Sequence, residues 1–481
     1  MTSRLPALSP GPGEVGVRAA GARAEIGILA TCALNNFLIF GTFSALNVAL
    51  PAMSRDLAGG VSTASWILLG FLLANSATTI LFAKLSDEWG RRWFYFGGIL
   101  VFTLSSLACA VVTDDVVLVV LRVLQGLASA CSMSTSSAVI SDVFPPRRLP
   151  MALGVFMALA GVATLVGPLV GGLLIDAYGW RSIFWMAVVV GTGAVAVGWD
   201  ALKHVHAPPV TAFRLDLVGT VTSAAGIAAL ILAVQLFGDD GISRRWVVAA
   251  AVAAVFLLLG FAAVERRHPH PLVDPGIVAG GRGQVYVAAF CAAMPTTGLI
   301  VVTTLYLQVM RGTSAAVAGL MLLPMGAAML VGSLAAGVVQ RWVSSRAANT
   351  AGALGLGVAT AAVTGVVAVD LPTWCLVVTL VASGLAQGLY QASLSARLLV
   401  GVPANRRGVA QGLRATIMNG SNALSTAMVI AAIAVVAGEH VIDGGSSAGA
   451  RTAFTVATGL LALFAVAAAV LTCRGRTAYA D

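Results

Sequence analysis

The residues in this sequence that could do chemistry are the few charges beside or inside long apolar stretches. The segment LSDEWGRR, residues 85–92, separates two such stretches and holds four charges in six positions: Asp87, Glu88, Arg91 and Arg92. A charge at the centre of a membrane helix costs roughly 3 kcal/mol on insertion scales. We therefore expect residues 85–92 to form a tight loop at the water boundary, with Gly90 allowing a sharp turn.

Arg122 is the second candidate, because it lies within an apolar stretch. An arginine inside a membrane is costly, and such residues usually mark a substrate or ion pathway. At a helical rise of 1.5 Å per residue, Arg122 lies about 9 Å from the outer boundary at residue 116. The alternative is structural: the guanidinium could reach outward to Asp115, seven residues earlier on the same helix face.

The composition identifies the elements that must position these charges. The 481 residues are 59% hydrophobic and 10% charged, whereas a soluble protein carries about 25% charged residues. The chain is therefore predicted to be an all-α polytopic membrane protein. The net charge of +9 sits in short loops between apolar stretches, so it reports orientation in the membrane and not nucleic-acid binding. The six cysteines form no C-x-x-C pair, which predicts neither a disulfide framework nor a metal site.

A membrane-crossing helix needs about 20 apolar residues. This rule predicts fourteen spans: 26–50, 63–83, 93–112, 116–141, 149–174, 180–200, 216–237, 246–264, 285–309, 315–340, 347–369, 373–397, 408–437 and 452–472. The expected domains are a disordered cytoplasmic tail (1–25), an N-terminal six-helix bundle (26–200), a linker with two extra transmembrane helices (201–284), a C-terminal six-helix bundle (285–472) and a second cytoplasmic tail (473–481).

The basic residues predict the orientation. Of 28 Lys and Arg residues, six fall in the expected outer loops: Arg55, Arg181, Arg244, Arg245, Arg311 and Arg451. All others except Arg122 fall in inner loops or at inner helix ends, so both termini are expected in the cytoplasm. The segment Gly337–Arg346 is an altered copy of residues 83–92, which suggests two related halves. Related halves that rock against each other are typical of membrane transporters.

Two motifs resemble the major facilitator superfamily. The stretch A-K-L-S-D-E-W-G-R-R resembles its loop between the second and third helices, with matches at Asp87, Gly90, Arg91 and Arg92. The stretch L-V-V-L-R-V-L-Q-G-L-A-S-A resembles its fourth-helix motif, with matches at Arg122, Gln125, Gly126 and Ala130. Over nearly its whole length the chain resembles the fourteen-helix drug:proton antiporter branch. The resemblance implies two six-helix bundles with two inserted helices, and gating and coupling roles for the matched residues together with Asp142.

A third motif points to the direction of transport. The stretch G-P-L-V-G-G resembles the fifth-helix motif that marks exporters of this superfamily, with matches at Gly167, Pro168, Gly171 and Gly172. Ala163 stands where the motif usually has a further glycine. The proline removes a backbone donor and the glycines allow a neighbouring helix to approach closely. Plain helix packing is the alternative explanation.

The first span departs from the branch, because Thr42 stands where its relatives carry an acidic residue. Residue 42 lies about 12 Å from the outer end at residue 50, near the depth of Arg122. No Asp or Glu lies deep in any predicted span. This pattern disfavours strongly cationic substrates, whereas a neutral or anionic substrate could use Arg122 directly. Proton coupling would then depend on Asp87, or on Asp142 at the inner mouth, or would be weaker than full antiport.

The cavity walls are predicted by analogy with the family. The candidates are aromatic, hydroxyl and amide residues of spans 1, 4, 9, 12 and 13: Thr42, Phe43, Ser134, Tyr306, Gln387, Tyr390, Gln391, Asn419 and Asn422. Such groups in an apolar pocket suit amphipathic organic molecules. Polar residues also join membrane helices to one another, so packing is the competing interpretation for each.

The resemblance implies a secondary active exporter of small amphipathic organic molecules, such as a drug or an antibiotic, coupled to proton influx. It would act as a monomer in a bacterial inner (cell) membrane, with the substrate, protons and lipid as partners, and without cofactor or nucleic acid. An importer or facilitator and a non-transporting receptor stay open. A membrane enzyme is disfavoured, because His204-x-His206 and His268-x-His270 have no Cys or carboxylate cluster beside them and no Walker loop occurs.

Overall fold

The computed structural model describes residues 22–58, 60–144, 148–204, 217–237, 243–267, 282–399, 407–437 and 449–474, and all regular elements in these ranges are helices. The first half contains α1 (Ala22–Asn36), η1 (Phe37–Gly41), α2 (Thr42–Asp56), α3 (Gly60–Trp89), α4 (Arg91–Val111), α5 (Asp115–Val143), α6 (Leu149–Tyr178), α7 (Ser182–Ala201) and η2 (Leu202–His204). The second contains α8 (Leu217–Phe237), α9 (Arg244–Arg267), α11 (Arg282–Leu305), η3 (Tyr306–Met310), α12 (Ala315–Val339), α13 (Ser345–Val369), α14 (Thr373–Leu399), α15 (Arg407–Ala437) and α16 (Ala450–Arg474).

These helices give fourteen crossings, which confirms the predicted architecture. Twelve segments in the described residues are long and apolar enough to cross a membrane, with α1, η1 and α2 counted as one. The helices α3 and α8, of 30 and 21 residues, have the length for the other two. Because the number of crossings is even, α1 begins and α16 ends at the same end of the molecule. We call this the terminal end and the opposite one the far end.

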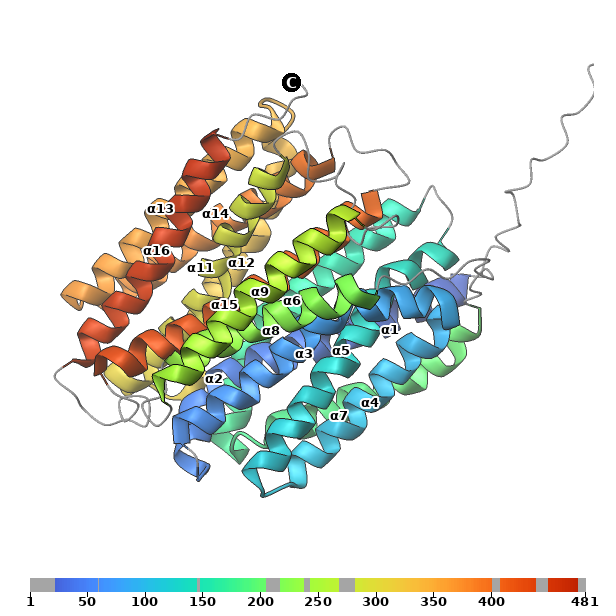
Figure 1. The fold of residues 1–481 in the computed structure, drawn as a ribbon, viewed down its shortest axis with the longest axis horizontal. Helices are drawn as coiled ribbons and strands as arrows, with labels where there is room; N and C mark the ends of the chain where they lie inside the picture. Colours follow the sequence, from blue (N-terminus) through green and yellow to red (C-terminus); the bar gives the residue numbers. More distant parts are fainter. Residues whose placement is uncertain are drawn as a thin grey trace, which may run out of the picture.

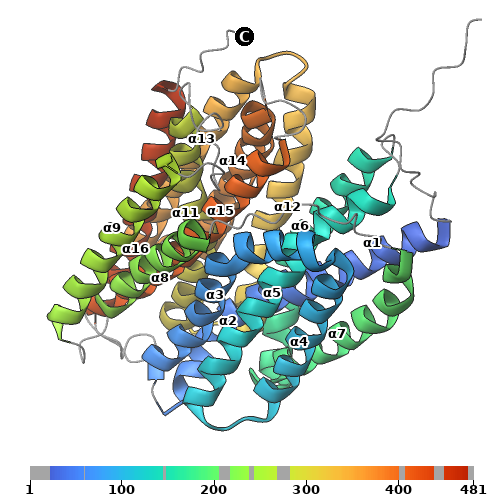
Figure 2. The ribbon, with the colours of Figure 1, turned by 45° about the vertical axis from the view of Figure 1, so that its right-hand side comes forward.

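The crossings form two six-helix bundles with two further helices at their junction (Figure 1). The first bundle, α1 to α7, and the second, α11 to α16, lie side by side in both views (Figures 1 and 2). Helix α8 packs against α3 of the first bundle and α15 of the second, and α9 packs against α8. Large apolar side chains of α9 such as Phe256 and Leu259 are exposed, so this helix is suited to face lipid.

The two bundles repeat one packing device between their second and fourth helices. A Cβ on Gly126 of α5 would collide with the carbonyl of Phe71 on α3. In the second bundle, a Cβ on Gly384 or Gly388 of α14 would collide with the carbonyl of Met325 or Met329 on α12. Glycine therefore allows the backbones to touch at corresponding places in each bundle, as expected for related halves.

The charged segment 85–92 differs from its predicted form. It was expected to be a loop, but α3 continues through Trp89 and α4 begins at Arg91. Only Gly90 interrupts the helix, with φ at +105°, a conformation that side chains with a Cβ rarely adopt. The turn at Gly90 is confirmed and the longer loop is wrong. A helix satisfies its own backbone groups, so it can continue past the last apolar residue.

Candidate functional site

Arg122 lies inside the first bundle, where its own bundle holds it in place. The side chain is 1% exposed, its Nε donates to the Ile67 carbonyl at 2.9 Å, and its Nη1 donates to Gln125 Oε1 at 2.6 Å. The guanidinium carbon lies 4.6 Å from the centre of the Phe71 ring, a cation–π distance. These contacts replace the suggested reach toward Asp115, so that alternative is wrong. Nη2 alone has no partner among the described residues.

Gln125 extends this arrangement to a third helix. Its Nε2 donates to Ser106 Oγ on α4 at 2.7 Å, and the Ser106 hydroxyl donates to the Phe102 carbonyl at 2.8 Å. The chain of hydrogen bonds therefore joins α3, α5 and α4. Burial removes hydration that is worth several kcal/mol to a guanidinium, so a buried arginine requires compensating hydrogen bonds of this kind.

The charged turn can be described only in part. Arg92 lies over the Trp93 ring at 5.1 Å, and Gly90 forms the break between α3 and α4. The side chains of Asp87 and Asp142 lie outside the described part of the chain, although both backbones are helical. Their coupling roles, with those of Arg91 and Arg92, remain predictions.

The fifth-helix motif lies at contacts of α6 with two partners. Gly167 faces η1 and α2 of its own bundle, where a Cβ would come within 2.8 Å of the Gly41 carbonyl and of Ser44 Cβ, and Gly171 faces Ala45 of α2. Gly172 faces the second bundle, where a Cβ would collide with the backbone of Ala315 on α12. The motif residues therefore seat α6 against both α2 and α12.

Helices α6 and α12 form the closest junction between the bundles. A Cβ on Gly319 of α12 would collide with the Pro168 carbonyl, and one on Gly326 would collide with the Leu165 side chain. Leu165 lies 13 residues before the end of α6, or about 20 Å from the far end. Beyond this point α6 and α12 spread apart toward the terminal end (Figure 2).

Polar groups close the junction at the far end. Asp176 Oδ2 on α6 accepts from the Ala316 backbone N–H at the first turn of α12, at 3.0 Å. Gln308 Nε2 of η3 donates to the Val48 carbonyl of α2 at 2.9 Å. Both bonds join one bundle to the other, so they must break if the far ends separate.

Of the predicted cavity residues of the first bundle, Phe43 is linked to Arg122 through a shared ring contact. Thr42, which follows the π-helix η1, is 1% exposed and its hydroxyl has no partner in the described residues. The next residue, Phe43, stacks on Phe71 at 5.9 Å, the same ring that carries the guanidinium. π-Helical turns occur often at functional sites. Ser134 instead donates back to the Cys131 carbonyl of its own helix.

One predicted residue, Asn419, bridges the two bundles by contacting the middle of α3. Asn419 Nδ2 on α15 lies 3.5 Å from Asn75 Oδ1 on α3, and Asn75 Nδ2 donates to Ser129 Oγ at 2.9 Å. On the same helix, Asn422 Oδ1 is buried without a partner among the described residues.

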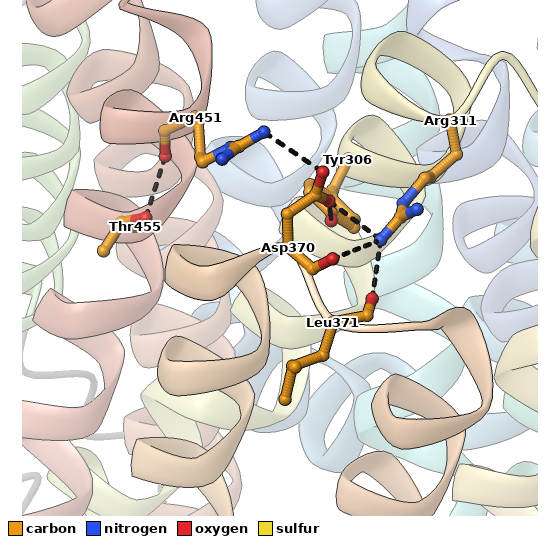
Figure 3. A network of polar contacts seen from close by, with 6 residues as sticks. All are labelled: Tyr306, Arg311, Asp370, Leu371, Arg451 and Thr455. Atoms are coloured by element: carbon orange, nitrogen blue, oxygen red, sulfur yellow. Dashed lines mark hydrogen bonds and ion pairs between the residues drawn. The ribbon is translucent and has the colours of Figure 1, made fainter.

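Tyr306 lies at the far end of the second bundle within an ionic network (Figure 3). Its hydroxyl donates to Asp370 Oδ1 at 2.7 Å, and Arg311 and Arg451 pair with the same carboxylate at 2.8 and 3.1 Å. The Tyr306 hydrogen bond, helped by the two arginines, lowers the pKa of Asp370 below its ordinary value of 3.8, although burial opposes this. The network joins η3 to the end of α13 and the start of α16.

The first bundle has a smaller counterpart at its far end. Asp56 Oδ2 accepts from Trp180 Nε1 at 2.9 Å and from Arg181 Nη1 at 2.7 Å. Arg181 precedes α7 as Arg451 begins α16, so an arginine occupies corresponding places in the two halves.

The remaining predicted residues lie in a polar group of the second bundle. The group also contains residues that the sequence did not indicate. Gln387 is 1% exposed and donates to Thr296 Oγ1, Gln391 accepts from Arg414 Nη2 at 2.9 Å, and the Tyr390 carbonyl accepts from Asn349 at 3.1 Å. Arg397 joins this group by donating to Asn349. We call the following five residues the donor cluster: Asn349, Tyr390, Gln391, Arg397 and Arg414.

The two arginines of the donor cluster lie just outside the apolar spans of α14 and α15, which end at Ser395 and begin at Ile417, yet both are at least partly buried. Arg397 is 6% exposed and donates to Asn349 Oδ1 at 3.3 Å, and Arg414 Nε is buried. Both had been assigned to inner helix ends. The location of Arg414 within the span predicted at residues 408–437 was the feature of the sequence that could have indicated its burial.

Two six-helix bundles with a polar interior and a far-end junction define an all-α, polytopic membrane protein. The family model of the Major Facilitator Superfamily matches residues 32–426, and the chain belongs to that superfamily. This confirms the resemblance found in the sequence.

Curated relatives of this chain are drug and antibiotic efflux proteins. It is 32% identical over 333 residues to the multidrug resistance protein Stp of Mycobacterium tuberculosis, covering 69% of this chain and 62% of that protein. It is 30% identical to a probable actinorhodin transporter of Streptomyces coelicolor, over 76% of this chain and 65% of the relative. A tetracenomycin C resistance and export protein of Streptomyces glaucescens is 28% identical, over 79% and 71%. The chain thus spans a little under two thirds of the length of the first two.

Solved structures agree on the fold. An auto-inhibited peptide transporter of the POT family superposes with a TM-score of 0.68 at 19% identity, covering 95% of this chain and 99% of the other. A bacterial homologue of the lysosomal transporter Spinster, in an inward-facing unoccupied conformation, gives 0.65 at 15% identity, covering 95% and 98%. Identities this low support the shared fold and nothing more.

Proposed function

We propose that this protein is a secondary active exporter of small amphipathic organic molecules, coupled to proton influx. The observation that carries the proposal is the junction of α6 and α12. The fifth-helix motif brings Gly172 against Ala315, and Asp176 bonds across to Ala316, so the bundles meet at the far end and spread at the terminal end. Relatives named as multidrug resistance and antibiotic export proteins support the direction of transport.

The proposed orientation has the terminal end in the cytoplasm of a bacterial cell. The excess of basic residues in the predicted inner loops supports it. In that orientation the far-end junction faces outward, and the spread terminal end admits substrate from the cytoplasm. Protons that cross from outside and leave to the cytoplasm through Asp87 or Asp142, both at the terminal end, would then drive the return to this state.

Resistance measurements test the function. The protein is expressed in an efflux-deficient bacterium that is challenged with toxic compounds of different charge. Raised minimum inhibitory concentrations that fall to control values when a protonophore collapses the gradient would support coupled export. Resistance that is unchanged by the protonophore would rule out proton coupling. Unchanged susceptibility to every compound would contradict export.

The importer and the receptor predict other results. Export concentrates substrate inside inverted membrane vesicles when the proton gradient is imposed, whereas an importer empties them. A receptor without transport activity shows no substrate-dependent proton flux in either direction.

A further inference from the structure

The donor cluster carries hydrogen-bond donors that the protein itself does not use. Arg414 Nη2 donates to Gln391 Oε1 at 2.9 Å, but Arg414 Nε is buried and has no partner among the described residues. Gln391 is 7% exposed, and its Nε2 is also buried without a partner in this part of the chain. Two side chains that already bond to each other therefore each leave one donor unpaired, at a cost of about 1–3 kcal/mol per group.

The charge in this region is positive on two sides. Arg397 is 6% exposed and donates to Asn349 Oδ1, and Asn349 in turn donates to the Tyr390 carbonyl. Arg414 bonds to Gln391, the residue that follows Tyr390 on α14, so both arginines are linked to the same turn of that helix. No carboxylate among the described residues pairs with Arg414. Arg414 is partly buried and its Nε is fully buried, so the guanidinium loses part of its hydration without a described counter-ion, which is unfavourable.

The arrangement matches one kind of ligand. The Nε and Nη2 atoms of an arginine form an edge that binds a carboxylate through two parallel hydrogen bonds, and charge-assisted bonds of this kind are about twice as strong as neutral ones. A Gln391 amide beside that edge offers a further donor. Gln387 Oε1 is a buried acceptor without a described partner, so a hydroxyl could also be held nearby.

The location fits entry from the terminal end. Arg414 lies seven residues into α15, or about 10 Å along the helix from its start at Arg407. Asn419, five residues further on, already contacts Asn75 of the other bundle. The donor cluster therefore lies between the terminal end and the residues that join the bundles.

We propose that Arg414 and Gln391 bind an anionic group of the transported molecule, a carboxylate or an ionised phenol. The inference rests on the proposed export function and narrows its substrate class to organic anions. An anionic lipid headgroup offers the same chemistry, and the test below separates the two sources.

The test is a binding measurement on purified protein in phosphatidylcholine nanodiscs, without a proton gradient. The probes are fluorescein, which is anionic, and tetramethylrhodamine ethyl ester, a cation on the same ring scaffold. Wild type is expected to bind fluorescein at least tenfold more tightly than the cation. Arg414→Gln should lose at least tenfold in fluorescein affinity and keep its affinity for the cation. Arg414→Lys, which retains the positive charge, should lose less fluorescein affinity than Arg414→Gln.

Arg341→Gln is the matched control, since it removes the same charge from an exposed position in the same bundle. It should bind both probes as wild type does. Gln391→Leu, which removes the amide donor and keeps the bulk, should weaken fluorescein binding severalfold even if Arg414→Gln fails to fold. Equal losses for both probes, or unchanged fluorescein affinity in the Arg414 and Gln391 variants, would overturn the assignment.

A lipid arm completes the experiment. Nanodiscs with added phosphatidylglycerol should change fluorescein affinity less than twofold if the site takes the transported anion. Competition by phosphatidylglycerol that is abolished in Arg414→Gln would assign the site to lipid and overturn the proposal. Because no gradient is needed, binding can succeed or fail independently of export in cells.

Discussion

The buried arginines of the two bundles are held in different ways. Arg122 in the first bundle uses Nε, Nη1 and the face of its guanidinium on Ile67, Gln125 and Phe71. Arg414 in the second has one hydrogen bond, to Gln391, and leaves a buried Nε without a described partner. The first arginine has two hydrogen bonds and a ring contact from its own bundle, and only its Nη2 lacks a described partner. Both arginines therefore leave one buried donor unpaired, and they differ in how many contacts the protein supplies to the rest of the guanidinium.

The largest expected effect comes from breaking the first arrangement. Arg122→Gln should lower the free energy of unfolding by about 2–5 kcal/mol, because Gln125 Oε1 and the Ile67 carbonyl are left as buried acceptors without a donor, at about 1–3 kcal/mol each. Thermal unfolding in detergent measures this, and transport of anionic and cationic probes should fall together. A variant as stable as wild type that loses only anion transport would show Arg122 to be the substrate ligand.

The junction between the bundles should respond next. Gly172→Ala introduces a Cβ against the backbone of Ala315, and overpacking of this kind costs about 1–3 kcal/mol. The far ends should separate, which spin labels placed on the two far-end loops would report as a longer distance. Gly161→Ala on the same helix is the control, because a Cβ there meets nothing within 4 Å. Equal distances in both variants would count against a tight junction.

A smaller effect is expected from Asp176, which bonds across the same junction. Asp176→Asn weakens a charge-assisted bond to the first turn of α12 and its interaction with the helix dipole, worth about 1 kcal/mol. The population with separated far ends should rise roughly fivefold on the same spin-label measurement. No change would mean that this contact does not hold the junction closed.

The smallest effect should appear in acid. The folded-state pKa of Asp370 is below 3.8, so its stabilisation is complete above the unfolded pKa and is lost as pH falls through the lower folded value. Asp370→Asn should cost about 1 kcal/mol at neutral pH. It should also reduce the loss of stability that wild type shows as the pH falls below the unfolded pKa of this carboxylate, in unfolding curves measured at decreasing pH. An identical acid response in wild type and variant would show that the network contributes nothing.

The fold was largely predictable because apolar length and loop charge act locally in the sequence. Fourteen spans, two bundles and two inserted helices all follow from stretches that a membrane requires. The extent of α3 did not follow, since a helix can continue into water through Asp87 and Glu88 until Gly90 breaks it. Hydropathy marks where the apolar part ends and says little about where the helix ends.

The site was predictable only where a motif carried it. Arg122, Gln125 and Gly126 were found from their spacing, and the structure adds the partners that fix them. Arg397 and Arg414 were assigned to the water boundary because they stand near helix ends. Their burial depends on side chains of α13 and α14 that are distant in sequence, so no local pattern reports it. Tyr306 was placed among cavity residues for its polarity, and its hydroxyl instead bonds to Asp370, 64 positions away.

The most direct test compares the two arginines in one transport experiment. Inverted vesicles under an imposed proton gradient would be given fluorescein or tetramethylrhodamine ethyl ester, with the rate in vesicles lacking the protein subtracted. In Arg414→Gln the ratio of anion to cation transport should fall at least tenfold, and in Arg122→Gln both rates should fall while the ratio holds. A ratio that falls in Arg122→Gln and holds in Arg414→Gln would contradict the account.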